Sequence, residues 1–180
     1  MIRITTFNTA STFGTDGVSD WKRGAGVIAD LCPDVVGCEE VTVHEDFEPD
    51  LDMPALYGEY LKMTPVFGRA TSRDGKGDYG VMALSKYPVT HVDKLELPTP
   101  PGYEQRICLI TKVEAPKTFY FLVTHFPTRN EFPGAEEARI RDIELITEQV
   151  ERDKLFPAVL CGDFNVEPGT PEIDFLHTLW

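Results

Sequence analysis

Four apolar, strand-like segments that each end in polar residues limit what this chain can fold into. The clearest covers residues 158–161 and is followed at once by Gly162-Asp163-Phe164-Asn165. A short apolar run bounded by turn residues is typical of a buried strand. Similar segments end at Asn8, at Glu40 and at Thr124-His125. Because sheets of α/β proteins often carry their sites at strand ends, the pattern predicts one site shared by the four ends.

Strand-like and helical segments alternate along the 180 residues. No internal repeat and no linker interrupts them, so we predict a single domain over residues 1–180. Apolar spacing predicts helices over 21–32 and 135–152, and a third after Thr170, which is expected to cap it. The predicted strands cover 2–7, 34–38, 62–67, 78–85, 91–97, 106–115, 118–124 and 156–162.

The composition is that of a globular protein, with 42% hydrophobic and 11% aromatic residues. No apolar run is long enough for a transmembrane segment, and no signal sequence precedes the first strand-like segment. The four cysteines lie in or beside apolar segments without the spacing of a zinc or redox motif. We therefore expect buried, reduced thiols and a cytoplasmic location.

The charge balance is acidic, with 17 basic and 30 acidic residues and a formal net charge of −13. Proteins that bind long nucleic acids usually present a basic face, so such a partner is disfavoured. A phosphorylated small molecule or a lipid headgroup, approached through a metal ion, fits the balance better. The alternative is a solvated acidic surface without functional meaning.

The residue types at the strand ends suit metal-assisted phosphoryl chemistry. Mg²⁺ prefers carboxylate and amide oxygens, which Glu40, Asp163 and Asn8 would supply, and Mn²⁺ is the second choice. Asp163 and Asn165 are two residues apart, so in an extended backbone they would point the same way and converge on one ligand. The alternative is an ordinary polar turn after a strand.

Several motifs resemble those of the endonuclease/exonuclease/phosphatase superfamily, to which deoxyribonuclease I belongs. They occur in the family's order over the whole chain: Asn8, Cys38-Glu-Glu-Val41, Asp78-Tyr-Gly-Val-Met-Ala-Leu-Ser-Lys-Tyr-Pro88, Glu104-Gln-Arg106, Thr124-His125 and Gly162-Asp-Phe-Asn165. The resemblance implies an α/β fold, a four-layer sandwich in which two mixed β-sheets pack face to face with helices outside.

The resemblance also implies roles on the metal side of the site. Glu40 matches the family's metal-binding glutamate, and Asn8 matches the asparagine that helps to hold metal or phosphate. Asp163 matches the aspartate that aligns or activates the attacking water. The competing interpretations are a strand-end cap for Asn8 and a surface acid for Glu40, although neighbouring Glu39 fits the surface better.

Three further residues match the family's phosphate contacts. Asn165 matches the asparagine that contacts the scissile phosphate, and His125 matches a histidine that binds it. Arg106 falls where the family often has a phosphate-contacting arginine. The competing interpretations are a core histidine with satisfied hydrogen bonds and a strand-edge arginine.

One family motif is missing from these 180 residues. The family closes with a strand that ends in Ser-Asp-His, and this sequence contains no such tripeptide. His177 lies in a segment with helical spacing, so we do not expect it to be catalytic. By the resemblance, the domain is incomplete at its C-terminal side and lacks its last strands.

The sequence leaves three functions open. The leading one is a divalent-metal-dependent phosphoesterase that hydrolyses a phosphodiester or phosphomonoester. The alternatives are an endonuclease acting on nucleic acid and a non-catalytic module of the same fold. The loops at 9–20, 69–77 and 127–134 carry no motif that names a substrate. Arg69, Arg73 and Lys76 in the second loop are expected to be solvated, and contact with substrate phosphate is the alternative.

Overall fold

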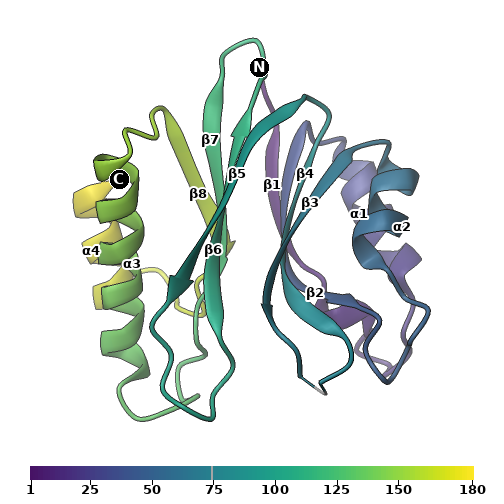
Figure 1. The fold of residues 1–180 in the computed structure, drawn as a ribbon, viewed down its shortest axis with the longest axis horizontal. Coiled ribbons are helices and arrows are strands. Elements are labelled where there is room, and N and C mark those ends of the chain that lie inside the picture. The colour runs from purple at the N-terminus through teal and green to yellow at the C-terminus, as the bar shows by residue number, and fades with distance from the viewer. Residues whose placement is uncertain (74) are drawn as a thin grey trace.

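In the computed structural model, which describes residues 1–73 and 75–180, two four-stranded β-sheets lie face to face with helices on both outer faces (Figure 1). Helices α1 (Trp21–Leu31) and α2 (Met53–Leu61) cover one sheet. Helices α3 (Ala135–Arg152) and α4 (Pro171–Leu179) cover the other. The predicted four-layer α/β sandwich is therefore confirmed.

Each sheet mixes parallel and antiparallel neighbours. In the first sheet β1 pairs in parallel with β2, and β4 runs antiparallel to both β2 and β3. In the second sheet β7 and β8 are parallel, while β5–β6 and β6–β7 are antiparallel. The strands are β1 (Ile4–Asn8), β2 (Val35–Val43), β3 (Thr64–Thr71), β4 (Asp78–Ser85), β5 (Val89–Leu97), β6 (Arg106–Val113), β7 (Phe119–His125) and β8 (Ala158–Asp163).

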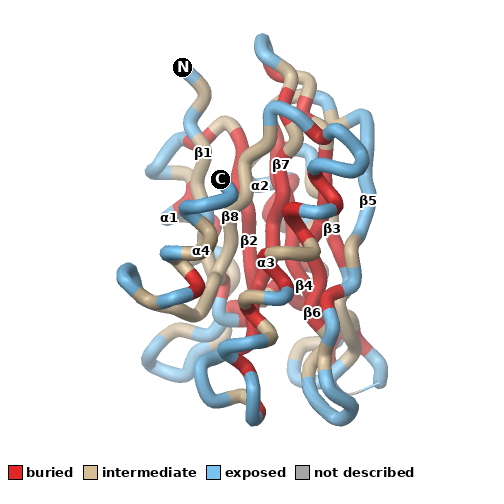
Figure 2. The backbone as a smooth tube through the Cα atoms, turned by 90° about the vertical axis from the view of Figure 1, so that its left-hand side faces the viewer, coloured by how far each residue is buried: buried red, intermediate tan, exposed pale blue. Residues whose placement is uncertain are grey.

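Three apolar layers hold the sandwich together. The middle layer joins the two sheets through Val81 and Val35 on one side and Leu109, Phe121 and Val123 on the other. The outer layers seal each sheet against its helices. Figure 2 shows buried residues running along β2, β4, β6 and β7, while the connecting turns are exposed. Strands buried on both faces read as continuous apolar runs, which is why the sequence marks them so clearly.

Strand β2 does not end at Glu40, so that sequence prediction is wrong. The strand continues to Val43, and its register with β4 shifts between Cys38 and Val41. The extra residue forms a β-bulge, and Glu40 takes a left-handed backbone conformation with φ of 57°. A polar pair inside a strand looks like a strand end in the sequence because a bulge also interrupts the apolar pattern.

The cysteine prediction holds for two thiols and fails for one. Cys38 and Cys108 are buried and Cys161 is half-buried, but Cys32 is exposed. Cys32 ends helix α1 in a left-handed conformation, which turns it away from the core. All four are free thiols, and none of the helices in the described part of the chain is long and apolar enough to cross a bilayer.

Gly162 is a position where the fold demands a glycine. Its φ is 148°, and a Cβ there would lie 1.9 Å from the Thr124 carbonyl oxygen of β7. We predict that Gly162→Ala lowers the free energy of unfolding by about 2–4 kcal/mol, measured by urea denaturation.

The matched control is Gly26→Ala in helix α1, where an added Cβ meets nothing within 4 Å. This variant should gain about 1 kcal/mol or less from helix propensity. Equal stability of the two variants would contradict the close approach of β8 to β7.

Candidate active site

Asn8, at the end of β1, joins two carboxylates that come from different sheets. Its Nδ2 donates to Glu40 Oε1 at 3.0 Å and to Asp163 Oδ2 at 2.9 Å. Its Oδ1 accepts from the Ala10 N–H at 2.9 Å, which fixes which end of the amide faces the acids. Three residues that lie up to 155 positions apart thus meet, as the sequence predicted, although Glu40 comes from a bulge within β2 and not from a strand end.

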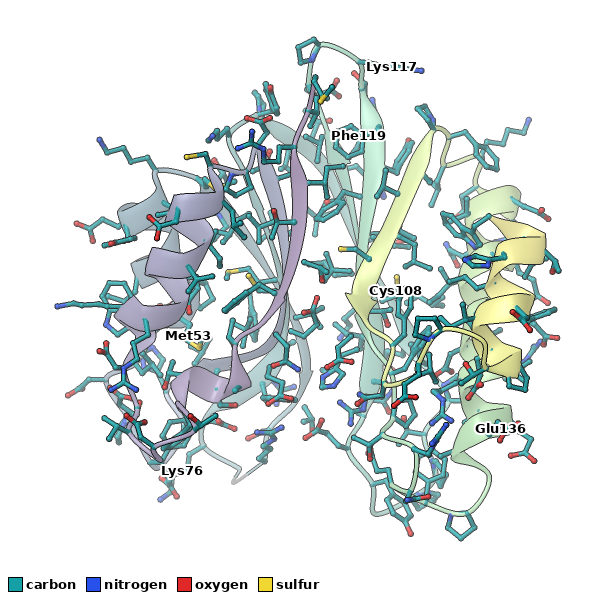
Figure 3. All side chains as sticks on the ribbon, turned by 180° about the vertical axis from the view of Figure 1, so that it is seen from behind. Met53, Lys76, Cys108, Lys117, Phe119 and Glu136 are labelled. Atoms are coloured by element: carbon teal, nitrogen blue, oxygen red, sulfur yellow. The ribbon has the colours of Figure 1, made fainter. Side chains whose placement is uncertain are left out.

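The meeting depends on two strands that face each other across the sandwich. Strands β1 and β8 are in contact, and Figure 3 shows them side by side. The β2 bulge then turns Glu40 toward them. The Thr9 hydroxyl holds the bulge by donating to the backbone oxygens of Glu39 at 2.9 Å and Glu40 at 2.8 Å.

Asn165 is placed differently from the prediction. Its backbone is left-handed, with φ of 52°, so the extended i, i+2 geometry proposed for Asp163 and Asn165 is wrong. The Asn165 N–H donates to Asp163 Oδ1 at 2.9 Å and closes a turn. The Asn165 Nδ2 donates to the Phe126 carbonyl at 2.8 Å, which ties the turn to the end of β7. Asn165 therefore orients Asp163 rather than pointing beside it.

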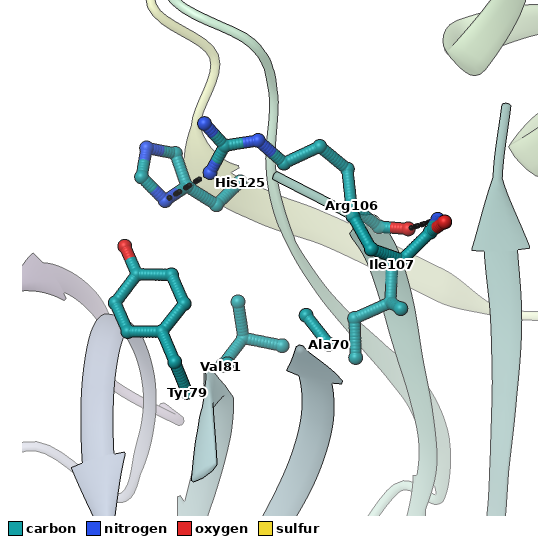
Figure 4. Close-up of a pocket in the computed structure, with 8 residues that line it drawn as sticks. Ala70, Tyr79, Val81, Arg106, Ile107 and His125 are labelled. Atoms are coloured by element: carbon teal, nitrogen blue, oxygen red, sulfur yellow. Dashed lines mark hydrogen bonds between the residues drawn. The ribbon is translucent and has the colours of Figure 1, made fainter. Parts of the chain in front are cut away.

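His125 and Arg106 form a buried pair. Arg106 Nη1 donates to His125 Nδ1 at 3.2 Å (Figure 4). Because a guanidinium has only donors, Nδ1 must be the acceptor and Nε2 must carry the ring proton. Burial, and then the charge of Arg106, lower the pKa of His125 to about 4. His125 is therefore a neutral N–H donor at pH 7.

A small cavity of about 10 Å³ lies beside this pair, lined by Tyr79, Val81, Ile107 and other residues (Figure 4). Its size suits one water molecule or one oxygen atom of a ligand. The Tyr79 side chain is 2% exposed, and its hydroxyl has no hydrogen-bond partner among residues 1–73 and 75–180. A buried hydroxyl without a hydrogen-bond partner destabilises the folded state, so a polar atom bound in this cavity would be stabilised by bonding to it.

Glu39 was expected on the surface, and that prediction is wrong. Its side chain is 1% exposed and accepts from the Thr6 hydroxyl at 2.9 Å. Burial is the main reason that its pKa rises to about 8, and the charges of Asp163 and Glu40 raise it further. Sequence alternation could not find this because the bulge changes which of the two glutamates faces inward.

Charged residues around Arg106 make contacts that the sequence analysis did not predict. Arg73 and Arg106 both bind Glu104, and Arg106 also binds Glu131. Asp142, on α3, is buried, and burial raises its pKa to about 7. Glu104 lies in the Glu104-Gln-Arg106 motif, which was the available signal. The others lie in loops or on a helix, where nothing in the sequence shows their partners.

The donor set favours a hard cation with few protein ligands. Within the described ranges there is no group of three His, Cys, Asp or Glu side chains placed to bind a metal. Glu40 and Asp163 nevertheless both accept from the Asn8 amide nitrogen and so lie close together, and Mg²⁺ in proteins commonly takes one or two carboxylates and keeps its remaining waters. Asn8 presents its N–H groups to the acids, so a metal-ligand role would need its amide turned over.

A family model described as the Endonuclease/Exonuclease/phosphatase family matches residues 5–179. The chain belongs to this family. Members of the family hydrolyse phosphate esters, and the recognition made from the motifs is confirmed. The motif residues that carried it, including Asn8, Glu40 and Asp163, are the ones that the structure brings together.

Solved structures of the family share the fold. An endonuclease/exonuclease/phosphatase from Beutenbergia cavernae is 25% identical with a TM-score of 0.76, and the match covers 95% of this chain and 50% of that one. Sphingomyelinase C from Streptomyces griseocarneus is 19% identical with a TM-score of 0.73, and the match covers 98% of this chain and 68% of that one. A mannosyl-6-phosphatase from Bacteroides thetaiotaomicron is 18% identical with a TM-score of 0.70, and the match covers 99% of this chain and 70% of that one. The chain thus spans between half and about seven-tenths of these relatives.

The buried state of His125 generates a pH prediction. Its pKa falls from 6.5 to about 4 in the folded chain, so between these values the unfolded chain alone binds a proton. The contribution of His125 to stability should therefore fall by about 2–3 kcal/mol as the pH drops through this window, and be fully present above pH 6.5.

The measurement compares free energies of unfolding from pH 4 to 7 for the unaltered chain and for His125→Gln. The difference between them should grow with pH and then level off. His177→Gln, which alters an exposed histidine, should keep the original pH dependence. A His125→Gln curve parallel to that of the unaltered chain would contradict the buried neutral state.

Proposed function

We propose that this chain is a divalent-metal-dependent phosphoesterase acting on a phosphorylated small molecule or lipid headgroup. The observation that carries the proposal is the Asn8 amide shared by Glu40 and Asp163, beside a neutral His125 held by Arg106. It combines carboxylates for a hard cation with donors for a phosphate. Paired acids and neutral donors of this kind serve hydrolysis of phosphate esters.

In this proposal Glu40 would hold Mg²⁺, or Mn²⁺ in its place. The cation supplies charge neutralisation at the phosphate and at the leaving oxygen. Asp163 orients the attacking water and accepts its proton. Asn8 keeps the two carboxylates in register by donating one N–H to each.

The phosphate is held from the other side by the second sheet. His125 donates its Nε2–H to a phosphoryl oxygen and stays neutral, so it adds a hydrogen bond without titrating near pH 7. Arg106 supplies the positive charge behind it. Asn165 contributes indirectly, because its backbone N–H fixes one oxygen of Asp163 and leaves the other facing Asn8.

The choice of substrate class rests on charge and on the relatives. A net charge of −13 disfavours long nucleic acid, which is bound mostly through its phosphates. Two relatives are named for a sphingolipid and for a phosphorylated sugar. The four free thiols support a reducing compartment such as the cytoplasm.

The test is hydrolysis of phosphodiesters and phosphomonoesters by the unaltered chain and by Asp163→Asn, with Mg²⁺ or with EDTA. We expect Asp163→Asn to lose about 10²–10⁴-fold in rate because the water loses its proton acceptor. EDTA should abolish turnover. Glu167→Gln, an exposed acid four residues later, should retain the rate.

Activity that survives both EDTA and Asp163→Asn would overturn the proposal. Efficient nicking of plasmid DNA at low salt would instead favour the endonuclease. A folded chain that binds Mg²⁺ but turns over no ester would favour the non-catalytic module.

Asn8→Ala separates metal binding from catalysis. The variant removes the donor that Glu40 and Asp163 share, so their mutual repulsion increases and the cation site loses its shape. We expect Mg²⁺ affinity, measured by calorimetry without substrate, to fall by about 10–100-fold. Thr5→Ala, a change on the same strand, is the control and should bind as before. Unchanged affinity in Asn8→Ala would exclude an organising role for Asn8.

A further inference from the structure

Two arginines form ion pairs with the same carboxylate, that of Glu104, beside the candidate site. Arg73 Nε donates to Glu104 Oε2 at 2.8 Å, and Arg106 Nη1 forms an ion pair with Glu104 Oε1 at 2.7 Å. Arg73 comes from the loop between β3 and β4, whereas Arg106 begins β6 in the other sheet. Two guanidinium groups that converge on one anion are an arrangement suited to phosphate or carboxylate.

Each arginine has other contacts that hold it in place without Glu104. The Arg73 guanidinium stacks on the Tyr79 ring, with Cζ 3.3 Å from the centroid, and its Nη1 donates to the Ser11 hydroxyl at 3.4 Å. Arg106 Nη2 donates to Glu131 at 2.8 Å. Removing the Glu104 carboxylate would therefore leave both cations where they are.

Glu104 is the least fixed member of the three. It lies in the segment between β5 and β6, which includes Pro98, Pro100 and Pro101 and has no regular structure. Its side chain is 20% exposed, and in the described part of the chain its ion pairs are with the two arginines. A carboxylate on such a segment can leave for solvent at little structural cost.

The position between the arginines is connected to the proposed reaction site. Arg73 lines a cavity of about 530 Å³ that Glu40 and Ser11 also line. Two acids, Glu45 and Asp46, line the same cavity, and Asp46 forms an ion pair with Lys76 at 2.9 Å. An anionic group in this cavity would consequently be held at its arginine end.

We propose that Arg73 and Arg106 form a subsite for a second phosphate group of the substrate, and that Glu104 occupies this subsite until the substrate displaces it. The inference rests on the proposed function for the place of the reacting phosphate. It narrows the substrate class to esters that carry another phosphate near the bond that is cleaved. Glu104 then acts as a built-in competitor that disfavours substrates with a single phosphate.

The competing interpretation is that the ion pairs only tie the two sheets together. The two interpretations predict opposite changes in anion affinity for one variant, Glu104→Gln. If Glu104 competes with an anion, Glu104→Gln frees both arginines and strengthens anion binding. If Glu104 is structural, the same change loosens the arginines and weakens anion binding.

The experiment titrates inorganic phosphate into the chain in the presence of EDTA, followed by calorimetry or amide chemical shifts. We expect Glu104→Gln to bind phosphate about three- to tenfold more tightly and Arg73→Gln about tenfold more weakly. Arg69→Gln is the matched control, since Arg69 lies on β3 and pairs with half-buried Asp78. It should bind as the unaltered chain does. Arg73→Lys keeps the positive charge but loses the paired N–H donors of the guanidinium, so its phosphate affinity should lie between those of the unaltered chain and Arg73→Gln. It replaces Arg73→Gln if that variant does not fold.

Weaker or unchanged phosphate binding by Glu104→Gln would overturn the proposal, as would an equal loss in Arg69→Gln and Arg73→Gln. The titration requires no turnover, so it is independent of the hydrolysis test. If Glu104→Gln binds phosphate more tightly and Arg73→Gln more weakly but the chain hydrolyses no ester, the subsite is supported and the phosphoesterase function is contradicted. If the chain hydrolyses esters but both variants bind phosphate with unchanged affinity, only the subsite proposal is contradicted.

Discussion

The arrangement of the site depends on one amide that lets two carboxylates lie side by side. Two carboxylates that bind the same amide nitrogen lie close enough to repel each other, and the shared donor offsets this repulsion. Asn8 donates one N–H to each, and the backbone of Ala10 fixes the amide by donating to its oxygen. This works only if β1 of one sheet and β8 of the other meet, so the apolar layer between the sheets sets the chemistry at their ends.

The β2 bulge is the second constraint, because it decides which glutamate enters the site. Side chains alternate between the faces of a regular strand, and one extra residue reverses every later assignment. Here the bulge buries Glu39 beneath the site and leaves Glu40 beside Asn8. The result is two adjacent acids with different states. The high pKa of Glu39, which burial causes, favours a protonated group near pH 7, and its protonation removes a third negative charge from beside Asp163.

The fold could be predicted from the sequence because its strands are buried on both faces and its long helix has a single apolar stripe. Strand β4 and helix α3 have the bounds that the pattern predicted. The grouping of Asn8 and Asp163 followed from strand ends, whereas Glu40 joins them from a bulge inside β2. The bulge and the left-handed turn at Asn165 could not be predicted, because each depends on a single backbone conformation. The contacts of Arg73 and Glu104 join distant loops, and no local pattern encodes them.

The electrostatics of the site follow from the acidity of the whole chain. Both arginines near the reaction site are already paired with acids, and the surface carries an excess of negative charge. Long-range attraction of a phosphate is therefore weak, and binding must come from contacts that form only at short range. Such contacts favour a compact substrate whose anionic groups can replace an existing partner, as a second phosphate would replace Glu104. A long polyanion gains less, because most of its phosphates would face acidic surface.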